Sequence, residues 1–270
     1  MRREPNDMTS QEAAEALAWL AEMGAGEVIG EQPVNRLAQA VAAPAEPSSR
    51  RKPEPMVQQR PAPVLKTPAA AAKDVASCQT LDDIMAALAG FDACPLKKTA
   101  TNLCFADGNP EARVMLVGEA PGRDEDIQGK PFVGKSGQLL DRMLSAIGLS
   151  RGAAEPENSV FITNTIFWRP PGNRTPTEAE TTMCLPFLLR AIEIQQPQFI
   201  VCLGATPAQR LTGRSDGILR MRGKWLEAIV SGRRIPLLPT LHPAYLLRQP
   251  AQKRLAWRDL LSLRQMLDAR

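Results

Sequence analysis

Three segments of the chain hold the polar side chains best suited to chemistry, and each follows a run of apolar residues. Residues 118–134 (GEAPGRDEDIQGKPFVG) combine several carboxylates with small residues that let a ligand approach backbone N–H groups. Residues 163–176 (TNTIFWRPPGNRTP) include Asn164, whose amide offers a donor and an acceptor to a planar ligand. Residues 241–250 (LHPAYLLRQP) contain His242, the only histidine. Together these groups could orient a water molecule and bind a polar, planar ligand.

Each segment also has a purely structural explanation when it is taken alone. A Gly/Pro turn commonly ends a strand, an asparagine commonly caps a turn, and a lone histidine is more often structural than catalytic. The acids of the first segment could orient water, bind a metal or discriminate a base, and the residues alone leave these roles open. These acids are Glu119, Asp124, Glu125 and Asp126.

From about residue 75 onward, the chain alternates between apolar strands and helices. Strands are expected at residues 112–120, 160–165, 198–204 and 235–243. Helices are expected at residues 75–91, 136–149 and 177–195, around Ala208, and at 250–269. This alternation is typical of an α/β domain with a central, mostly parallel sheet of four strands, whose ligand site lies where the strands end. The three polar segments should therefore converge on one edge of the sheet.

Composition divides the chain into three parts. Residues 1–31 include an amphipathic helix expected at 10–23, which either docks on its own domain or binds another protein. Residues 32–74 are rich in Pro and Ala and carry few aromatic residues, so they predict a disordered, basic linker. Residues 75–270 form the α/β domain.

Charge is distributed unevenly behind the formal net value of +4. Residues 205–270 carry 13 Lys or Arg against 4 acids, whereas residues 74–204 carry 11 against 16. A segment this basic suggests a polyanionic partner, although a solvated helix face gives the same count.

Several classes of protein are excluded or disfavoured. One histidine cannot supply a two-His metal site within one subunit. Five cysteines without tight pairing do not suggest a secreted disulfide framework. The N-terminal residues lack the apolar core of a signal peptide, and no apolar run reaches about 18 residues. We therefore expect a soluble, cytoplasmic protein.

Three long motifs resemble the signature segments of family 4 uracil-DNA glycosylases, in the same order and spacing. They are GEAPGRDEDIQGKPFVGKSGQLLD, ITNTIFWRPPGNRTP and HPAYLLR, and the resemblance covers roughly residues 75–268. It implies a three-layer α/β/α fold and a monomeric enzyme that flips uracil out of single- or double-stranded DNA. Hydrolysis of the N-glycosidic bond would leave an abasic site for base excision repair.

The resemblance implies roles for the residues that match the motifs. Glu119, with the backbone around Ala120, would position or activate the hydrolytic water. His242 would donate to uracil O2 as negative charge develops on the leaving base. Asn164 would pair with N3 and O4 of uracil, an edge that cytosine presents with opposite polarity.

The remaining roles concern stacking and contact with DNA. Phe132 would stack on the extruded base, and Glu125 would lie near the C5 edge of uracil and help to exclude a methyl group. DNA contacts are expected from Arg174 and from the segment that enters the duplex and fills the gap, which comprises Tyr245, Leu246, Leu247 and Arg248. No lysine matches a Schiff-base nucleophile, so the resemblance implies a monofunctional enzyme without lyase activity.

The chain departs from this family at its cysteines. Family members typically hold a [4Fe-4S] cluster with four Cys, but only Cys94 and Cys184 match ligand positions here. Phe91 and Trp168 stand at the other two. We therefore expect no metal and no cofactor, with Cys94 and Cys184 as remnants, and we keep a [4Fe-4S] cluster as the alternative.

Two alternative functions remain open. The fold and chemistry could act on other deaminated bases, such as hypoxanthine or xanthine, if the altered cysteine region reshapes the pocket. The chain could also be a non-catalytic DNA-binding protein, although such a protein has no need for all of Glu119, Phe132, Asn164 and His242. No membrane contact is expected, and the N-terminal segment could contact a repair or replication protein.

Overall fold

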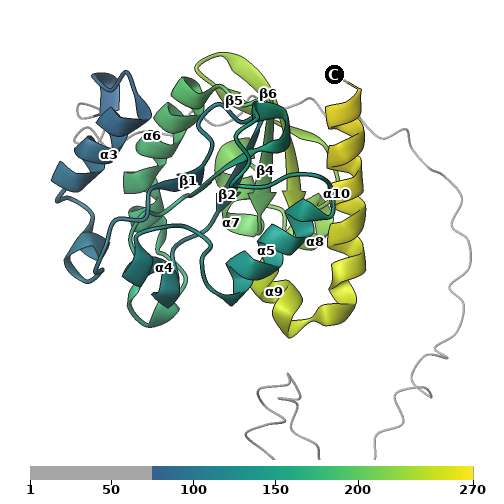
Figure 1. Cartoon of the computed structure of the whole chain (residues 1–270). Helices are drawn as coiled ribbons and strands as arrows, with labels where there is room; N and C mark the ends of the chain where they lie inside the picture. Colours follow the sequence, from purple (N-terminus) through teal and green to yellow (C-terminus); the bar gives the residue numbers. More distant parts are fainter. Residues whose placement is uncertain (1–74, 270) are drawn as a thin grey trace, which may run out of the picture. The chain divides into compact units, whose positions relative to one another are not determined.

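The computed structural model describes residues 75–269. The expected N-terminal segment (1–31) and linker (32–74) lie outside the described residues, as does the helix at 10–23. Figure 1 shows three layers, with α3 and α6 on one side of the sheet and α5 and α10 on the other. The α/β/α fold class expected from the sequence is confirmed.

Four parallel strands form the centre of the sheet, and all four were expected. They are β2 (Val114–Gly118), β3 (Val160–Asn164), β4 (Phe199–Leu203) and β6 (Arg233–Thr240). Their order is β3-β2-β4-β6, so β2 and β4 lie between parallel neighbours. Residues of β2, β3 and β4 are buried throughout, which explains the apolar sequences of β2 and β4 and the apolar start of β3.

The sheet has six strands rather than four, so the predicted number was wrong. β1 (Ala106–Gly108) pairs antiparallel with β3 at one edge, and β5 (Leu226–Val230) pairs antiparallel with β6 at the other. β1 is only three residues long and half-buried, which leaves almost no periodic signal. β5 did leave a signal in the sequence, although we did not predict the strand: Ser231 and Gly232 (φ 48° and 80°) form the tight turn of a hairpin between β5 and β6.

The two faces of each strand build two separate cores. Met115 and Val117 of β2 pack on the side of α3 and α6, whereas Val114 and Leu116 pack on the side of α5 and α10. This alternation is the period of two that a strand imposes on its side chains. Burial on both faces fixes the register of β2, and with it the position of the loop that follows.

Five longer helices cover the sheet, close to where they were expected. They are α3 (Leu81–Gly90), α5 (Lys135–Ser145), α6 (Glu178–Gln195), α7 (Ala205–Thr212) and α10 (Lys253–Asp268). α3 begins six residues later than predicted, because Thr80 and Asp83 form a capping box at its start. α6 contains Pro186 in its interior, as expected.

Several short helices stand where only loops were expected. Three are α-helical: α4 (Arg123–Gln128), α8 (Ile218–Met221) and α9 (Pro243–Arg248). Four are single 3₁₀ turns within residues 75–269, and each begins at a proline that presets the first φ angle: η3 (Pro95–Lys98), η4 (Pro156–Asn158), η5 (Pro171–Asn173) and η6 (Pro250–Gln252). Within residues 75–269, no helix is long and apolar enough to cross a membrane.

Candidate active site

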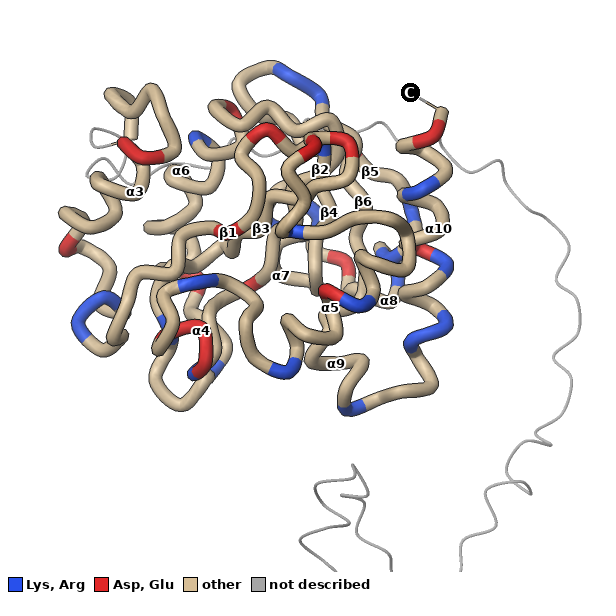
Figure 2. Tube along the Cα trace, viewed as in Figure 1, with Lys and Arg blue, Asp and Glu red and all other residues tan. Residues whose placement is uncertain are grey.

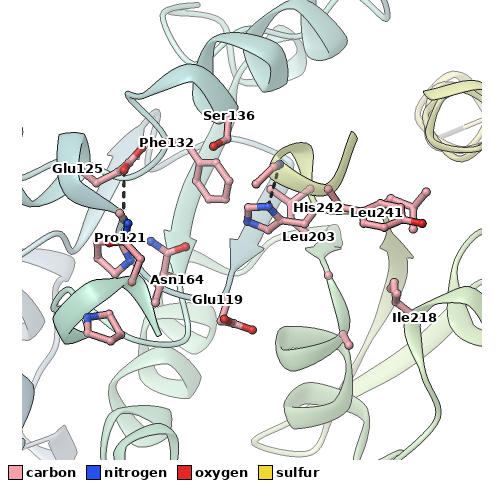
Figure 3. A pocket seen from close by; sticks show the side chains of 18 of the residues that line it. Glu119, Pro121, Glu125, Phe132, Ser136, Asn164, Leu203, Ile218, Leu241 and His242 are labelled. Carbon is pink, nitrogen blue, oxygen red and sulfur yellow. Dashed lines mark hydrogen bonds between the residues drawn. The ribbon is translucent and has the colours of Figure 1, made fainter. Parts of the chain in front are cut away.

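A cavity of about 650 Å³ opens at the carboxyl ends of the parallel strands. The loops after β2, β3, β4 and β6 all contribute to its lining, as Figure 3 shows. The cavity brings together most of the residues singled out from the sequence: Glu119, Ala120, Glu125, Phe132, Asn164, Arg174, His242, Tyr245 and Arg248. The expected convergence of the three polar segments is confirmed.

Gly118 ends β2 and makes room for two pocket side chains. A Cβ atom at this position would lie 2.3 Å from Asn164 Oδ1 and 2.6 Å from the ring of Phe132. No other residue type avoids this overlap. The absence of a side chain at Gly118 therefore lets an amide and an aromatic ring meet at the floor of the pocket.

Phe132 occupies a backbone conformation that is rare for a residue with a side chain. Its φ angle is 54°, and a Cβ atom at Gly137 would lie 1.8 Å from its carbonyl oxygen. Its ring lies 5.6 Å from the imidazole of His242 between centroids, at an interplanar angle of 33°. The strained backbone places a flat apolar surface against one side of the pocket.

Glu125 lines the pocket, but its carboxylate is already engaged. One oxygen accepts from the amides of Val133 and Gly134, both at 2.9 Å, and the other accepts from Gly122 at 3.1 Å. The side chain therefore ties α4 to the loop that carries Phe132. Its geometry supports a role in shaping the pocket more than direct contact of a free carboxylate with a ligand.

Arg151 is a residue that the sequence analysis missed. Its guanidinium donates to the carbonyl oxygens of Pro131 (2.9 Å) and Phe132 (2.8 Å) and pairs with Asp107 and Asp141. Its side chain is 16% exposed. No local pattern marks Arg151, because its contacts come from loops and elements distant in the sequence.

Asn164 stands at the end of β3 and is 1% exposed. Its Oδ1 atom is buried and has no hydrogen-bond partner in the protein. A buried amide oxygen without a partner carries a desolvation cost of about 1–3 kcal/mol. This orphaned acceptor in the pocket is what a site for an N–H donor of a ligand requires.

Glu119 follows β2 and lies half-buried in the pocket wall. Its Oε2 accepts from the hydroxyl of Thr206 in α7 at 2.5 Å, and its carbonyl oxygen accepts from the hydroxyl of Thr165 at 2.7 Å. These contacts fix the direction of the carboxylate and leave one of its oxygens available. Thr206 is a second residue that the sequence analysis missed.

His242 caps the N-terminus of α9, and its hydrogen bond defines its tautomer. The Nδ1 atom accepts from the amide of Ala244 at 3.1 Å, so the proton of the neutral ring resides on Nε2. Burial and, to a smaller extent, the positive charge of Arg248 together lower the pKa of His242 to about 4. At neutral pH the imidazole is therefore an uncharged Nε2–H donor.

The segment expected to enter a duplex is the helix α9, and its residues face different ways. Leu246 is fully buried against Leu139, Leu241 and Ala256, so the prediction that it contacts DNA was wrong. Leu246 lies on the face of α9 that packs against the core. Leu247 is 39% exposed and stays a candidate, although it does not line the cavity.

Two further residues line the cavity, of which Arg174 is engaged in an ion pair and Leu219 is exposed. Arg174 lines the cavity but forms a bidentate ion pair with Glu180, with a shortest distance of 2.7 Å. Leu219 in α8 lines the cavity on its other side and is 65% exposed. Exposed leucine at the mouth of a pocket was not singled out from the sequence, because α8 is too short to show a pattern.

The positions expected to hold an iron–sulfur cluster do not offer a suitable set of donors. Cys94 and Cys184 are buried, and the Cys184 thiol donates to Cys94, which lowers the pKa of Cys94. Phe91 and Trp168 at the other two positions are buried rings, and Phe91 packs edge-on against Phe187 at 5.0 Å between centroids. Within residues 75–269, no group of three or more His, Cys, Asp or Glu could hold a metal ion. Two thiols and two aromatic rings do not fit a four-thiolate cluster.

Fold and site together define a class of protein. The pocket lies at the carboxyl edge of a parallel sheet and combines an aromatic ring, an orphaned amide, a neutral imidazole and a carboxylate. These groups suit a planar heterocycle attached to a polar group. The class is therefore an α/β protein whose site, at the carboxyl edge of its sheet, suits a planar heterocycle such as a nucleobase.

Comparison with known proteins agrees with this class and narrows it. The family model described as "Uracil DNA glycosylase superfamily" matches residues 105–261. The chain belongs to the uracil-DNA glycosylase superfamily.

Several curated relatives are named "Type-4 uracil-DNA glycosylase". The protein from Archaeoglobus fulgidus is 42% identical over 176 residues, which cover 64% of this chain and 85% of that protein. The protein from Pyrobaculum aerophilum is 41% identical over 63% of this chain and 85% of its own length. The protein from Thermotoga maritima is 42% identical over 58% of this chain and 77% of its own length. The resemblance to family 4 seen in the motifs is thereby confirmed.

Proposed function

We propose that this protein is a monofunctional glycosylase that removes uracil from DNA and acts in base excision repair. The observation that carries the proposal is the orphaned Oδ1 atom of Asn164, which shares a pocket with the ring of Phe132 and the Nε2–H donor of His242. The names of its curated relatives support the same activity.

Recognition of uracil would use hydrogen bonds of defined polarity. The Asn164 Oδ1 accepts from N3–H of uracil, and the amide nitrogen of the same side chain donates to O4. Cytosine has an acceptor at N3 and a donor at C4, so both contacts would become repulsive. The ring of Phe132 stacks on the base, while Glu125 holds the loop that presents this ring.

Hydrolysis would divide its two tasks between a carboxylate and an imidazole. The oxygen of a water molecule bonds to C1′ of the deoxyribose as the bond from C1′ to N1 breaks, and the electron pair of that bond leaves with uracil. The Glu119 carboxylate, oriented by Thr206, accepts the proton of the water. The neutral His242 donates from Nε2 to O2, where negative charge develops.

Base flipping would involve the exposed part of α9. Tyr245 and Arg248 line the cavity and Leu247 is exposed beside it, so these residues would fill the gap left by the base and contact the backbone. Arg174 is paired with Glu180, so a contact with DNA would either share its guanidinium with this carboxylate or break the ion pair. Flipping costs a few kcal/mol, which such contacts offset.

Neither a metal nor a lysine has a part in this mechanism. The cluster positions supply two thiols and two aromatic rings, and we propose that the chain folds and acts without a [4Fe-4S] cluster. The residues that line the cavity include no lysine, which supports hydrolysis over a Schiff-base route. We further propose that the protein works in the cytoplasm, and contact of its N-terminal segment with a repair protein stays a prediction.

Oligonucleotides that contain a single uracil, hypoxanthine or xanthine would test the proposal. We expect the protein to release uracil and leave an abasic site in both single and double strands. Asn164→Ala should lower the rate of uracil release by at least about a hundredfold, since a recognition amide and its pairing are lost. The matched control is Asn158→Ala, an exposed asparagine before β3 at the opposite edge of the sheet.

Other outcomes of the same assay would reject this function. Release of purines alone would favour an enzyme with altered base specificity. Binding of DNA without any base release would favour a non-catalytic protein. Equal losses in Asn164→Ala and Asn158→Ala would indicate that Asn164 has no special part in recognition.

A further inference from the structure

A second cavity, of about 370 Å³, lies between α5, α9 and α10, outside the proposed active site. Its lining is mostly apolar, with two cations among the lining residues. These residues are Leu139, Arg142, Met143, Ala146, Leu246, Lys253, Ala256, Trp257 and Leu260. The mechanism of base release uses none of their side chains, so the groove is open to another purpose.

Trp257 gives the groove an unusual surface. Its side chain is 41% exposed, whereas Trp168 is buried and Trp225 donates its indole N–H to Ser262. Trp257 is therefore the exposed tryptophan within residues 75–269, and it lies beside apolar side chains. A flat aromatic face that is open to water suits stacking against another flat ring.

The cations around Trp257 are not neutralised by the protein. Arg142, Lys253, Arg254 and Arg258 are all exposed, and within the described part of the chain none of them forms an ion pair. Figure 2 shows lysine and arginine gathered along the part of α10 that follows α9.

The first turn of α10 carries positive charge, although the dipole of a helix favours negative charge there. The first turn has no acid and holds Lys253 and Arg254, although a helix N-terminus stabilises negative charge. At the other end of α10, Arg264 is paired with Asp268. The positive potential of the helix dipole and the cations therefore add together beside Trp257, which makes this surface attractive to a polyanion.

The helix α9 places this surface beside the active site. Tyr245 and Arg248 of α9 line the first cavity, and Leu246 of the same helix lines the groove. Because an α-helix is about 10 Å across, the two sites lie about 10 Å apart. One DNA strand advances about 3.4 Å per stacked nucleotide, so about three nucleotides span this distance.

We propose that the groove between α5, α9 and α10 binds unpaired DNA next to the target nucleotide, with one base stacked on Trp257 and phosphates along Lys253, Arg254 and Arg258. The proposal rests on the proposed function for its ligand. DNA fits better than an acidic protein, because the groove shares α9 with the pocket that takes the flipped base. A strand that enters the pocket therefore continues past Trp257.

The test measures binding of uracil-free single-stranded oligonucleotides of about 5 and about 20 nucleotides, at several salt concentrations. We expect Trp257→Ala to lower the affinity for the long oligonucleotide about tenfold, as for loss of one base–aromatic stack, and Trp257→Phe to retain most of it. The double variant Arg254→Gln, Arg258→Gln should reduce the slope of log K against log salt by about 1.4, or about 0.7 for each lost phosphate contact.

Two controls match these variants. Leu261→Ala removes an apolar side chain that is 40% exposed, one turn further along α10 and outside the groove. Arg234→Gln removes an exposed cation at the amino end of β6, away from the site edge. Both should bind the long oligonucleotide as the unaltered protein does, and melting temperatures would confirm that every variant is folded.

The second measurement is the ratio of kcat/KM for a long uracil substrate to that for a short one. Extension of the substrate on one side of the uracil should raise this ratio in the unaltered protein, and Trp257→Ala should abolish the gain. An unchanged affinity and an unchanged ratio in Trp257→Ala and in the double variant would overturn the proposal and leave the groove to an acidic protein. Because the binding arm needs no uracil, a protein that binds through Trp257 but releases no base would reject the proposed function alone.

Discussion

The guanidinium of Arg151 donates to the carbonyl oxygen of Phe132 at 2.8 Å, although 19 positions separate the two residues. Phe132 has a positive φ angle, which turns its carbonyl group toward the loop after α5. Arg151 holds this carbonyl and that of Pro131, so it supports the position of the aromatic ring although it does not itself line the cavity. The pocket therefore depends on a residue well outside its lining.

Substitution of Arg151 should affect catalysis through the position of Phe132. We expect Arg151→Met to lower kcat/KM for uracil release about tenfold or more, and to cost about 2–3 kcal/mol of stability through lost charge-assisted hydrogen bonds. Steady-state kinetics and denaturant unfolding measure the two effects. Arg151→Lys should rescue stability in part but activity little, because one ammonium cannot replace the planar fork of donors.

A purely structural role for Arg151 would give a different result. In that case, activity per folded molecule would stay unchanged, and only the free energy of unfolding would fall. Arg190 provides the control, since its guanidinium also donates to a backbone carbonyl oxygen, that of Cys78, away from the pocket. Arg190→Met should lower stability and leave kcat/KM unchanged.

The protonation of His242 can be observed directly, because the chain contains a single histidine. Nitrogen NMR of the imidazole should show the Nε2–H tautomer at neutral pH and a pKa of about 4, below the usual value of 6.5. As the pH falls from about 6.5 to about 4, the unfolded chain takes up a proton that the folded protein does not, so stability should fall.

The rate of uracil release should depend on the protonation state of His242. Uracil release should not depend on the titration of His242 between about pH 6 and 8 and should change near pH 4, where the ring becomes charged. A histidine that titrates with a normal pKa would contradict its burial, and a proton on Nδ1 would contradict the hydrogen bond from Ala244.

Leu219 should act as a wedge when the substrate is a duplex. It is 65% exposed on the rim of the cavity, where an apolar side chain can enter the base stack next to a flipped nucleotide. We expect Leu219→Ala to lower the rate on double-stranded substrate about tenfold relative to single-stranded substrate. The control is Ile229→Ala, which removes an apolar side chain that is 52% exposed on β5 and should leave this ratio unchanged. An unchanged ratio in Leu219→Ala would show that Leu219 has no such role.

Iron analysis of protein purified without oxygen tests the prediction of a cluster-free fold. We expect no absorbance near 400 nm from iron–sulfur charge transfer and far less than one iron per chain. Replacement of both Cys94 and Cys184 by Ala should leave the protein folded and active, because a pair of buried thiols is then only part of the core. About four irons per chain, lost in this double variant, would refute the prediction.

The central fold was accessible from the sequence because its signals are local. The apolar runs that became β2 and β4, and the apolar start of β3, are buried on both faces, as is typical of central strands covered by helices on both sides. Glu119, Asn164 and His242 follow three of the central strands, so parallel topology alone predicted that they meet. The edge strand β1 was missed because three half-buried residues carry almost no period, whereas β5 was missed although the Ser231–Gly232 turn marks its hairpin with β6.

Other features depended on contacts between distant parts of the chain. The periodicity of α9 was hidden in six residues, so only its packing against α5 revealed that Leu246 is buried. Arg151 and Thr206 gained their roles from the loop of Phe132 and from Glu119, each far away in the sequence. No pattern of neighbouring residues could have indicated these pairs.

The sequence by itself determined the class of fold, the edge of the sheet that carries the site, and the side chains available for chemistry there. These depend on the hydrophobic periodicity of short segments and on residue types, both of which can be read from neighbouring residues. The tertiary structure decided which atoms are free to act: it left Asn164 Oδ1 without a partner, fixed the His242 proton on Nε2 and engaged the Glu125 carboxylate. The physical reason is that a hydrogen bond joins two atoms in space, and which donors and acceptors remain unused is known only once the whole chain has folded.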